Sequence, residues 1–137
     1  LPTRESDGKA NLHAGGIGVG ISIQTGETTH GVYRGEPITK HPDTHVEIRG
    51  RTIPGWDAIL EMASRFYGIT GLGYLGVDVV IDRDKGPMML EVNARPGIAI
   101  QVANQKGLKH RLRLVEKHAH ELLTTEERIA FAKSHFA

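Results

Sequence analysis

The order of apolar and polar positions predicts strands in the first half of the chain and helices at its end. Residues 15–23 and 29–35 are short apolar runs that contain glycine, and the turn-forming segment between them indicates a β-hairpin. Residues 36–53 contain scattered proline, aspartate, threonine and glycine, so we expect a loop there. Residues 53–68 have apolar side chains at helical spacing, with proline near the start and glycine at the end, and predict a helix. The apolar positions of this helix are Trp56, Ile59, Leu60, Ala63, Phe66 and Tyr67.

A second hairpin is predicted over residues 76–97, where two apolar runs flank a polar turn. Helices are expected after it, over residues 98–107, 108–123 and 125–136. Thr124 and Glu127 have the spacing of a capping box, which predicts the start of the last helix. The pattern as a whole indicates an α+β fold, in which an antiparallel sheet is covered on one face by the 56–67 helix and the C-terminal helices pack alongside.

Composition excludes several classes of protein. A chain of 137 residues suits one domain, and a net charge of +1 gives no strong field that would attract nucleic acid or a membrane surface. No apolar run approaches the roughly 20 residues of a membrane-spanning helix, and no charged segment followed by an apolar one opens the sequence, so we expect no secretory signal. The chain contains no cysteine, so we expect a cytoplasmic protein without disulfides.

Polar side chains interrupt both strands of the predicted 76–97 hairpin. With the turn at Asp84–Lys85, Asp78 lies opposite Glu91, and Asn93 follows on the same face of its strand. The opposite face is apolar and is expected to contain Val77, Val79, Ile81, Leu90 and Val92. Two facing carboxylates repel each other, and a hard cation such as Mg²⁺ or Mn²⁺ removes that repulsion. The spacing therefore predicts a metal site, and a hairpin with one solvated polar face is the alternative.

Three other chemical signals are weaker. GGIGVG, at residues 15–20, lacks the residue order of a phosphate loop, and we interpret it as a strand with close backbone packing. His41 and His45 are four residues apart, but the proline between them predicts a loop, and His118 and His120 are two apart on a predicted helix and point apart. Neither pair is therefore expected to place two zinc ligands on one helix face. Residues 106–117 are basic, which suits an RNA-binding helix, but no aromatic side chains are interleaved, so a solvated face is the favoured interpretation.

The hairpin sequence GVDVVIDRDKGPMMLEVNARPG resembles the metal-binding end of ATP-grasp ligases. In that superfamily an acidic residue on one strand, and a glutamate and an asparagine two residues apart on the next, hold Mg²⁺ against the phosphates of the nucleotide. The resemblance implies that the corresponding metal ligands of this chain are Asp78, Glu91 and Asn93. The same three residues follow from the register of the hairpin.

A second segment, KANLHAGG over residues 9–16, is similar to a segment of the ribosomal-protein glutamate ligase branch of ATP-grasp enzymes. Lys9 occupies a position where that branch usually has arginine, and Ala14 also departs from a frequent arginine. The greatest likeness is to alpha-L-glutamate ligase-like proteins, and it extends from Leu1 to about residue 115.

The resemblance implies an ATP- and Mg²⁺-dependent ligation of a carboxylate to an amine, on an amino acid or peptide, through an acyl phosphate. Asp78 and Glu91 are then expected to contact the nucleotide through the metal. Lys9, which we expect on a strand, and Arg95 are candidate cationic partners of a phosphate or a substrate carboxylate. Asn11 is expected to donate or accept a hydrogen bond near the transferred group. Lys9 and Asn11 are also implied in nucleotide binding.

The chain begins at Leu1 and not at methionine, and we expect residues 1–137 to be the C-terminal portion of one ATP-grasp domain, with a helical tail over 108–137. The expected partners are small-molecule or peptide carboxylate and amine substrates and a missing N-terminal ATP-grasp lobe, with neither nucleic acid nor membrane. Alone, the chain is expected to bind metal weakly, to lack ligase activity and to self-associate through uncovered apolar surface. The alternative function is a non-catalytic ATP-grasp-like binding or scaffold module.

Overall fold

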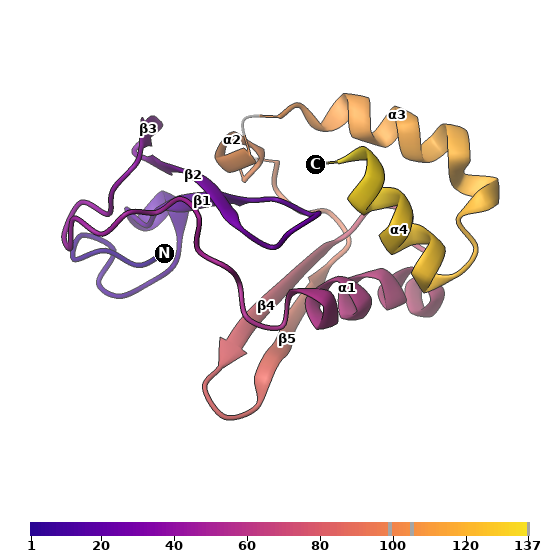
Figure 1. Cartoon of the computed structure of the whole chain (residues 1–137), viewed down its shortest axis with the longest axis horizontal. Coiled ribbons are helices and arrows are strands. Elements are labelled where there is room, and N and C mark those ends of the chain that lie inside the picture. The colour runs from indigo at the N-terminus through magenta and orange to yellow at the C-terminus, as the bar shows by residue number, and fades with distance from the viewer. Residues whose placement is uncertain (99, 105, 137) are drawn as a thin grey trace.

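The computed structural model has the predicted α+β architecture, and its antiparallel strands are divided between two small sheets (Figure 1). The structure describes residues 1–98, 100–104 and 106–136. The first sheet has the strand order β1-β2-β3, with β1 at Gly18–Ile21, β2 at Thr28–Tyr33 and β3 at Glu36–Ile38. The second sheet is a hairpin of β4 at Gly76–Asp82 and β5 at Gly86–Asn93. Both predicted hairpins are therefore confirmed.

The helices lie close to their predicted positions. They are α1 at Trp56–Thr70, α2 at Gln101–Asn104, α3 at Leu108–His118 and α4 at Thr125–His135, with short 3₁₀ turns η1 at Leu12–Ala14 and η2 at Ala119–Glu121. The capping box is confirmed, because Thr124 and Glu127 exchange hydrogen bonds between side chain and backbone. Of the predicted helix over 98–107, residues 99 and 105 lie outside the described part of the chain.

Two sequence predictions about these elements need correction. The 36–53 segment is not all loop, since it begins with β3, where Ile38 pairs with Gly31 of β2. The helix predicted over 108–123 ends as an α-helix at His118 and continues only as the 3₁₀ turn η2. No described helix is long and apolar enough to cross a membrane.

The tightest core lies where α2 packs on the first sheet. The buried apolar side chains are Ile17, Val32, Ile48 and Ala103. A Cβ atom at Gly18 would lie 3.0 Å from the Cβ of Ala103, and one at Gly20 would lie 2.7 Å from the carbonyl oxygen of Ala103. Real Cβ atoms do not approach so closely without displacement, so these glycines allow α2 to lie against β1. The interpretation of the glycine-rich segment as a closely packed strand is confirmed.

Helix α4 packs against α1 (Figure 1), and two basic side chains of α4 form polar contacts with α1. Arg128 of α4 donates from Nε to the Ser64 hydroxyl at 3.1 Å and from Nη1 to the Leu123 carbonyl at 2.8 Å. Lys133 forms an ion pair with Asp57 in the first turn of α1 at 2.6 Å. The contacts with Ser64 and Asp57 hold α4 beside α1, as the sequence predicts for a C-terminal helix.

The start of α1 lies between the two sheets and contacts both. The indole Nε1 of Trp56 donates to the Ile23 carbonyl at 2.9 Å, at the turn between β1 and β2. A Cβ atom at Gly26 in the same turn would lie 2.5 Å from Cγ of the indole, and Gly26 has φ +73°. On the other side, a Cβ atom at Gly55 would lie 2.7 Å from Cγ of Pro87 in β5. One turn of chain therefore touches both sheets.

Trp56→Phe is expected to lower the free energy of unfolding by about 1–3 kcal/mol, because it keeps an aromatic ring but removes the indole donor and part of the packed surface. Urea denaturation followed by far-ultraviolet circular dichroism measures this, since Trp56 is the only tryptophan of the chain and its fluorescence is lost. Tyr74→Phe is the control, because the Tyr74 hydroxyl makes no hydrogen bond within the described residues, and a change within about 0.5 kcal/mol is expected. Equal losses in both variants would contradict the assigned role of the indole.

Candidate functional site

The β4–β5 hairpin brings the predicted carboxylates together. Asp78 of β4 pairs directly with Glu91 of β5, as predicted, and Asn93 lies two residues further along β5 opposite Gly76. Residues two apart in a strand point to the same face, so the Asn93 amide lies on the side of Glu91. All three side chains are exposed, and neither carboxylate has a hydrogen bond or ion pair among the described residues. The pairing is confirmed, and metal binding by these residues stays a prediction.

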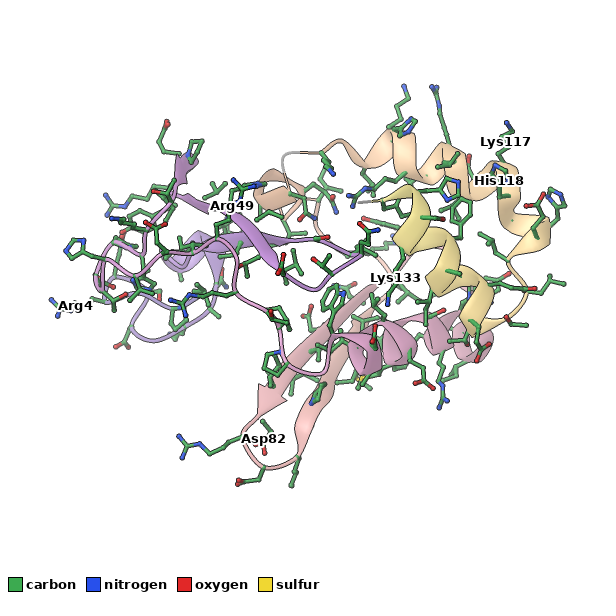
Figure 2. All side chains as sticks on the ribbon, in the orientation of Figure 1. Arg4, Arg49, Asp82, Lys117, His118 and Lys133 are labelled. Atoms are coloured by element: carbon green, nitrogen blue, oxygen red, sulfur yellow. The ribbon has the colours of Figure 1, made fainter. Side chains whose placement is uncertain are left out.

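The predicted position of the turn was wrong. The last strand pair is Asp82 with Gly86, so the turn is centred on Asp84 and not between Asp84 and Lys85. Asp82 Oδ1 accepts the backbone N–H groups of Lys85 and Asp84, each at 2.9 Å, and these hydrogen bonds lower the pKa of the Asp82 carboxyl. Figure 2 shows Asp82 at the end of the hairpin that is remote from the helices. This carboxylate shapes the turn.

A β-bulge in β5 restores the pairing of Asp78 with Glu91. Without the bulge, the observed turn would pair Asp78 with the residue before Glu91. Asp78 pairs with Glu91, but the next residue, Val79, pairs with Met89. Leu90 is therefore the extra residue of β5, and 63% of its surface is exposed. The prediction that Leu90 belongs to the apolar face is wrong, because a bulged residue leaves the alternation of its strand. The bulge adjoins the carboxylate pair, as bulges near functional sites often do.

The opposite face of β4 is apolar. Val77 lines a hollow of about 720 Å³ that it shares with α1, α3 and the segment before β4. The other apolar lining residues include Leu72, Leu75, Leu112, Val115 and Leu122. Since neighbouring residues of a strand point to opposite faces, Asp78 points away from this hollow. The hairpin thus turns the start of its apolar face toward α1 and α3, whereas Ile81 near the turn is 44% exposed.

Asn93 and Arg95 are arranged by a turn that follows β5. The amide oxygen of Asn93 accepts the backbone N–H of Arg95 at 2.9 Å, which leaves a second lone pair on that oxygen. Pro96 then lies over the start of β4, because a Cβ atom at Gly76 would be 2.8 Å from the Cβ of Pro96. This contact was not predicted from the sequence, although it joins the first residue of β4 to a proline that follows β5. Gly76 and Pro96 hold the turn that presents Asn93.

Lys9 and Asn11 do not lie on a strand, which corrects the sequence prediction. They belong to the loop before η1, where Lys9 is exposed. Asn11 caps η1, because its side-chain oxygen accepts the backbone N–H of His13 at 2.9 Å. No hydrogen bond or ion pair within the described residues joins Lys9 or Asn11 to the hairpin carboxylates. The structure therefore brings Asp78, Glu91 and Asn93 together and leaves Lys9 and Asn11 on a separate element.

The loop that contains Lys9 and Asn11 is held to the first sheet by Glu5. Arg34 donates to the Glu5 carboxylate from Nη2 at 2.7 Å and from Nε at 3.0 Å, and the Tyr33 hydroxyl donates to the same carboxylate. The Arg34 hydrogen bond, followed by that of Tyr33, lowers the pKa of Glu5. Thr3 donates from its hydroxyl to the Gly15 carbonyl at 2.7 Å. These contacts fix both ends of the loop.

The chemistry of the hairpin suits a hard cation. The Asp78 and Glu91 carboxylates face each other and repel, since no cation among the described residues pairs with them. The amide oxygen of Asn93 beside them is a third oxygen donor. Within the described residues, no three His, Cys, Asp or Glu side chains gather as a metal-binding group. The hairpin offers two carboxylates and an amide, which is the smaller set that Mg²⁺ uses when phosphate oxygens and water complete its shell.

Gly76→Ala is expected to lower the free energy of unfolding by about 1–3 kcal/mol, because the added methyl collides with Pro96 and must displace the turn that carries Asn93. The amide signal of Arg95 should move at the same time, since its hydrogen bond to Asn93 lies in that turn. Urea denaturation and heteronuclear NMR measure the two effects. Gly73→Ala is the matched control, because a Cβ atom there meets no atom within 4 Å. A loss as large for Gly73→Ala would contradict the role of Pro96.

The contribution of Asp82 to stability is expected to depend on pH. Its pKa in the folded state lies below the ordinary value of 3.8, so the contribution is complete above about pH 3.8 and is lost as the pH falls through the lower folded-state pKa. Asp82→Asn keeps an acceptor oxygen that does not titrate. The difference in urea midpoint between the two proteins should be constant at neutral and mildly acidic pH and shrink in strong acid. A difference that persists in strong acid would contradict the ionised carboxylate as its cause.

Comparisons with known proteins give one match. Residues 1–117 match the family described as sugar-transfer associated ATP-grasp, and the matched part includes both hairpins and the loop with Lys9 and Asn11. No curated protein matches the chain. No solved structure matches it either. The match covers most of the 137 residues, so the chain belongs to the sugar-transfer associated ATP-grasp family.

Proposed function

We propose that the chain supplies the metal-binding segment of an ATP-dependent carboxylate–amine ligase. Membership of an ATP-grasp family implies ATP-dependent chemistry of the ligase type. The observation that supports the narrower proposal is the pairing of Asp78 with Glu91, with Asn93 on the same face of the hairpin. A hairpin without a ligand gains nothing from two facing carboxylates, because they repel each other.

Asp78, Glu91 and Asn93 are the residues that would hold Mg²⁺ or Mn²⁺. The metal, when bound, neutralises the negative charge of the ATP phosphates. The chain's own contribution is to hold three oxygen donors on one rigid face. The bulge next to Glu91 and the turn after Asn93 set the directions of these donors.

The cationic and amide groups have separate proposed roles. Arg95 is exposed next to the Asn93 turn, where its guanidinium can bind a phosphate or a substrate carboxylate through two hydrogen bonds. Lys9 is exposed and can act as a second cation once substrate lies between its loop and the hairpin. Asn11 uses its side-chain oxygen as a helix cap, so its N–H₂ group remains to donate to a ligand.

The acid substrate is proposed to be an amino acid or peptide, activated as an acyl phosphate before an amine displaces the phosphate. This part rests on the resemblance to alpha-L-glutamate ligase-like proteins, whereas the matched family is described by its association with sugar transfer. The alternative, a non-catalytic binding or scaffold module, keeps the fold but does not require the facing carboxylates. The two functions therefore differ in what they expect of Glu91.

Glu91→Gln is expected to keep the fold and to weaken divalent-metal binding at least roughly tenfold. Loss of a residue that only hydrogen-bonds to a metal ligand already costs about that much, and Glu91 is proposed as a ligand itself. Without metal, stability should be unchanged or slightly higher, because the repulsion from Asp78 is relieved. Titration with Mn²⁺ in the presence of ATP, followed by the paramagnetic broadening of NMR signals around Asp78, measures the affinity. In a full-length ligase, ATP-dependent ADP release should fall to a small fraction and require more Mg²⁺.

Asp84→Asn is the matched control, because it removes the same charge from the exposed turn of the same hairpin. It should leave both metal binding and ADP release unchanged. Equal affinity in Glu91→Gln and the unaltered chain would show that Glu91 is not a ligand. Metal binding without any ATP-dependent ADP release in a full-length protein would favour the scaffold module.

A further inference from the structure

Helix α3 presents an exposed basic row that the proposed ligase site does not use. Lys109, Arg113 and Lys117 are four residues apart, so they lie on one face of the helix, and all three are exposed. None of them forms an ion pair or hydrogen bond with another described residue. In Figure 2 Lys117 points outward from α3, and His118 beside it packs against Phe131 of α4.

This row is unfavourable for the isolated helix. Like charges at a spacing of four residues destabilise a helix slightly, and soluble surfaces usually intersperse both signs. Glu116 is the one acidic residue of the fully described α3. Lys117 gains from the helix dipole in the last turn of α3, but no described ion pair or hydrogen bond offsets the repulsion along the row, which points to an anionic partner outside the chain.

An apolar hollow adjoins the basic row. It has a volume of about 450 Å³ and contains Ile98, Leu108 and Leu112, with Lys109 and Arg113 among its charged lining residues. The remaining lining residues are Gln101 and Glu116. Ile98 has 69% of its surface exposed, and no aromatic side chain lines the hollow. Aliphatic surface and unpaired cations thus meet on one side of the molecule.

We propose that this docking surface, which comprises Lys109, Arg113, Lys117 and the hollow at Ile98, binds the anionic phospholipids of a bilayer surface. The cations complement the headgroup phosphates, and Ile98 with the aliphatic floor contacts the boundary between headgroups and acyl chains. A nucleic acid would also attract the cations, but single-stranded binding relies on aromatic stacking, which this surface lacks. The low net charge of the whole chain does not oppose this, because surface potentials act within about 10 Å.

Vesicle flotation tests the proposal with the whole chain. Vesicles of phosphatidylcholine with phosphatidylglycerol should carry the protein, and vesicles of phosphatidylcholine alone should not. Each cation near an anionic membrane is worth roughly a fivefold factor in partitioning, so the triple variant Lys109→Gln, Arg113→Gln, Lys117→Gln should bind roughly a hundredfold less. Ile98→Gln should weaken binding several-fold, and the loss should persist at high salt because it is not electrostatic.

The matched control is Arg49→Gln, Arg83→Gln, Lys85→Gln, which removes the same charge at exposed positions outside α3. It should bind anionic vesicles nearly as well as the unaltered chain. Equal losses in the two triple variants would overturn the proposal, because binding would then follow net charge alone. Unaltered binding by Ile98→Gln, together with tighter binding to single-stranded nucleic acid than to vesicles, would also overturn it. Circular dichroism of each variant confirms that α3 is retained.

Discussion

The contact on which the rest of the structure depends is the seat of Trp56 at the turn between β1 and β2. The indole lies where Gly26 has no side chain, and its N–H satisfies the Ile23 carbonyl. Trp56 is the first residue of α1, and Gly55, which precedes it, lies against Pro87 of β5. The contact of Trp56 with the β1–β2 turn therefore sets the position of the second sheet relative to the first. Both residues at the junction with positive φ are glycines, as the close approach and the left-handed backbone require.

The hairpin can be polar on one face because its apolar face is turned toward α1 and α3. Val77 packs toward the shared hollow, so the apolar contacts of β4 do not need the face of Asp78. A two-stranded hairpin is marginally stable alone, and here α1 contacts β5 beside the β4–β5 pairing. The repulsion between Asp78 and Glu91 is tolerated at an exposed position, where water screens it.

Much of this arrangement was readable from the sequence, because alternation along 76–93 and the helical stripe of 56–70 are local patterns. The pairing of Asp78 with Glu91 was predicted correctly from a wrong turn, and the bulge at Leu90 made up the difference. A bulge depends on packing across the strands and leaves no local signal in this sequence. Strand β3 was missed because it contains Pro37, which is compatible with a strand only at the edge of a sheet, where β3 lies. The loop position of Lys9 and Asn11 depends on contacts with the remote Glu5–Arg34 pair.

The segment after β5 links the two candidate surfaces. Its start is held where Pro96 covers Gly76, and its end is held where Ala103 lies against Gly18 and Gly20. Ile98 lies in the chain between these two contacts. Ile98 is therefore exposed beside the α3 cations between the contact at the Asn93 turn and the contact of α2 with β1, which places the carboxylate hairpin and the proposed docking surface at the two ends of one short segment.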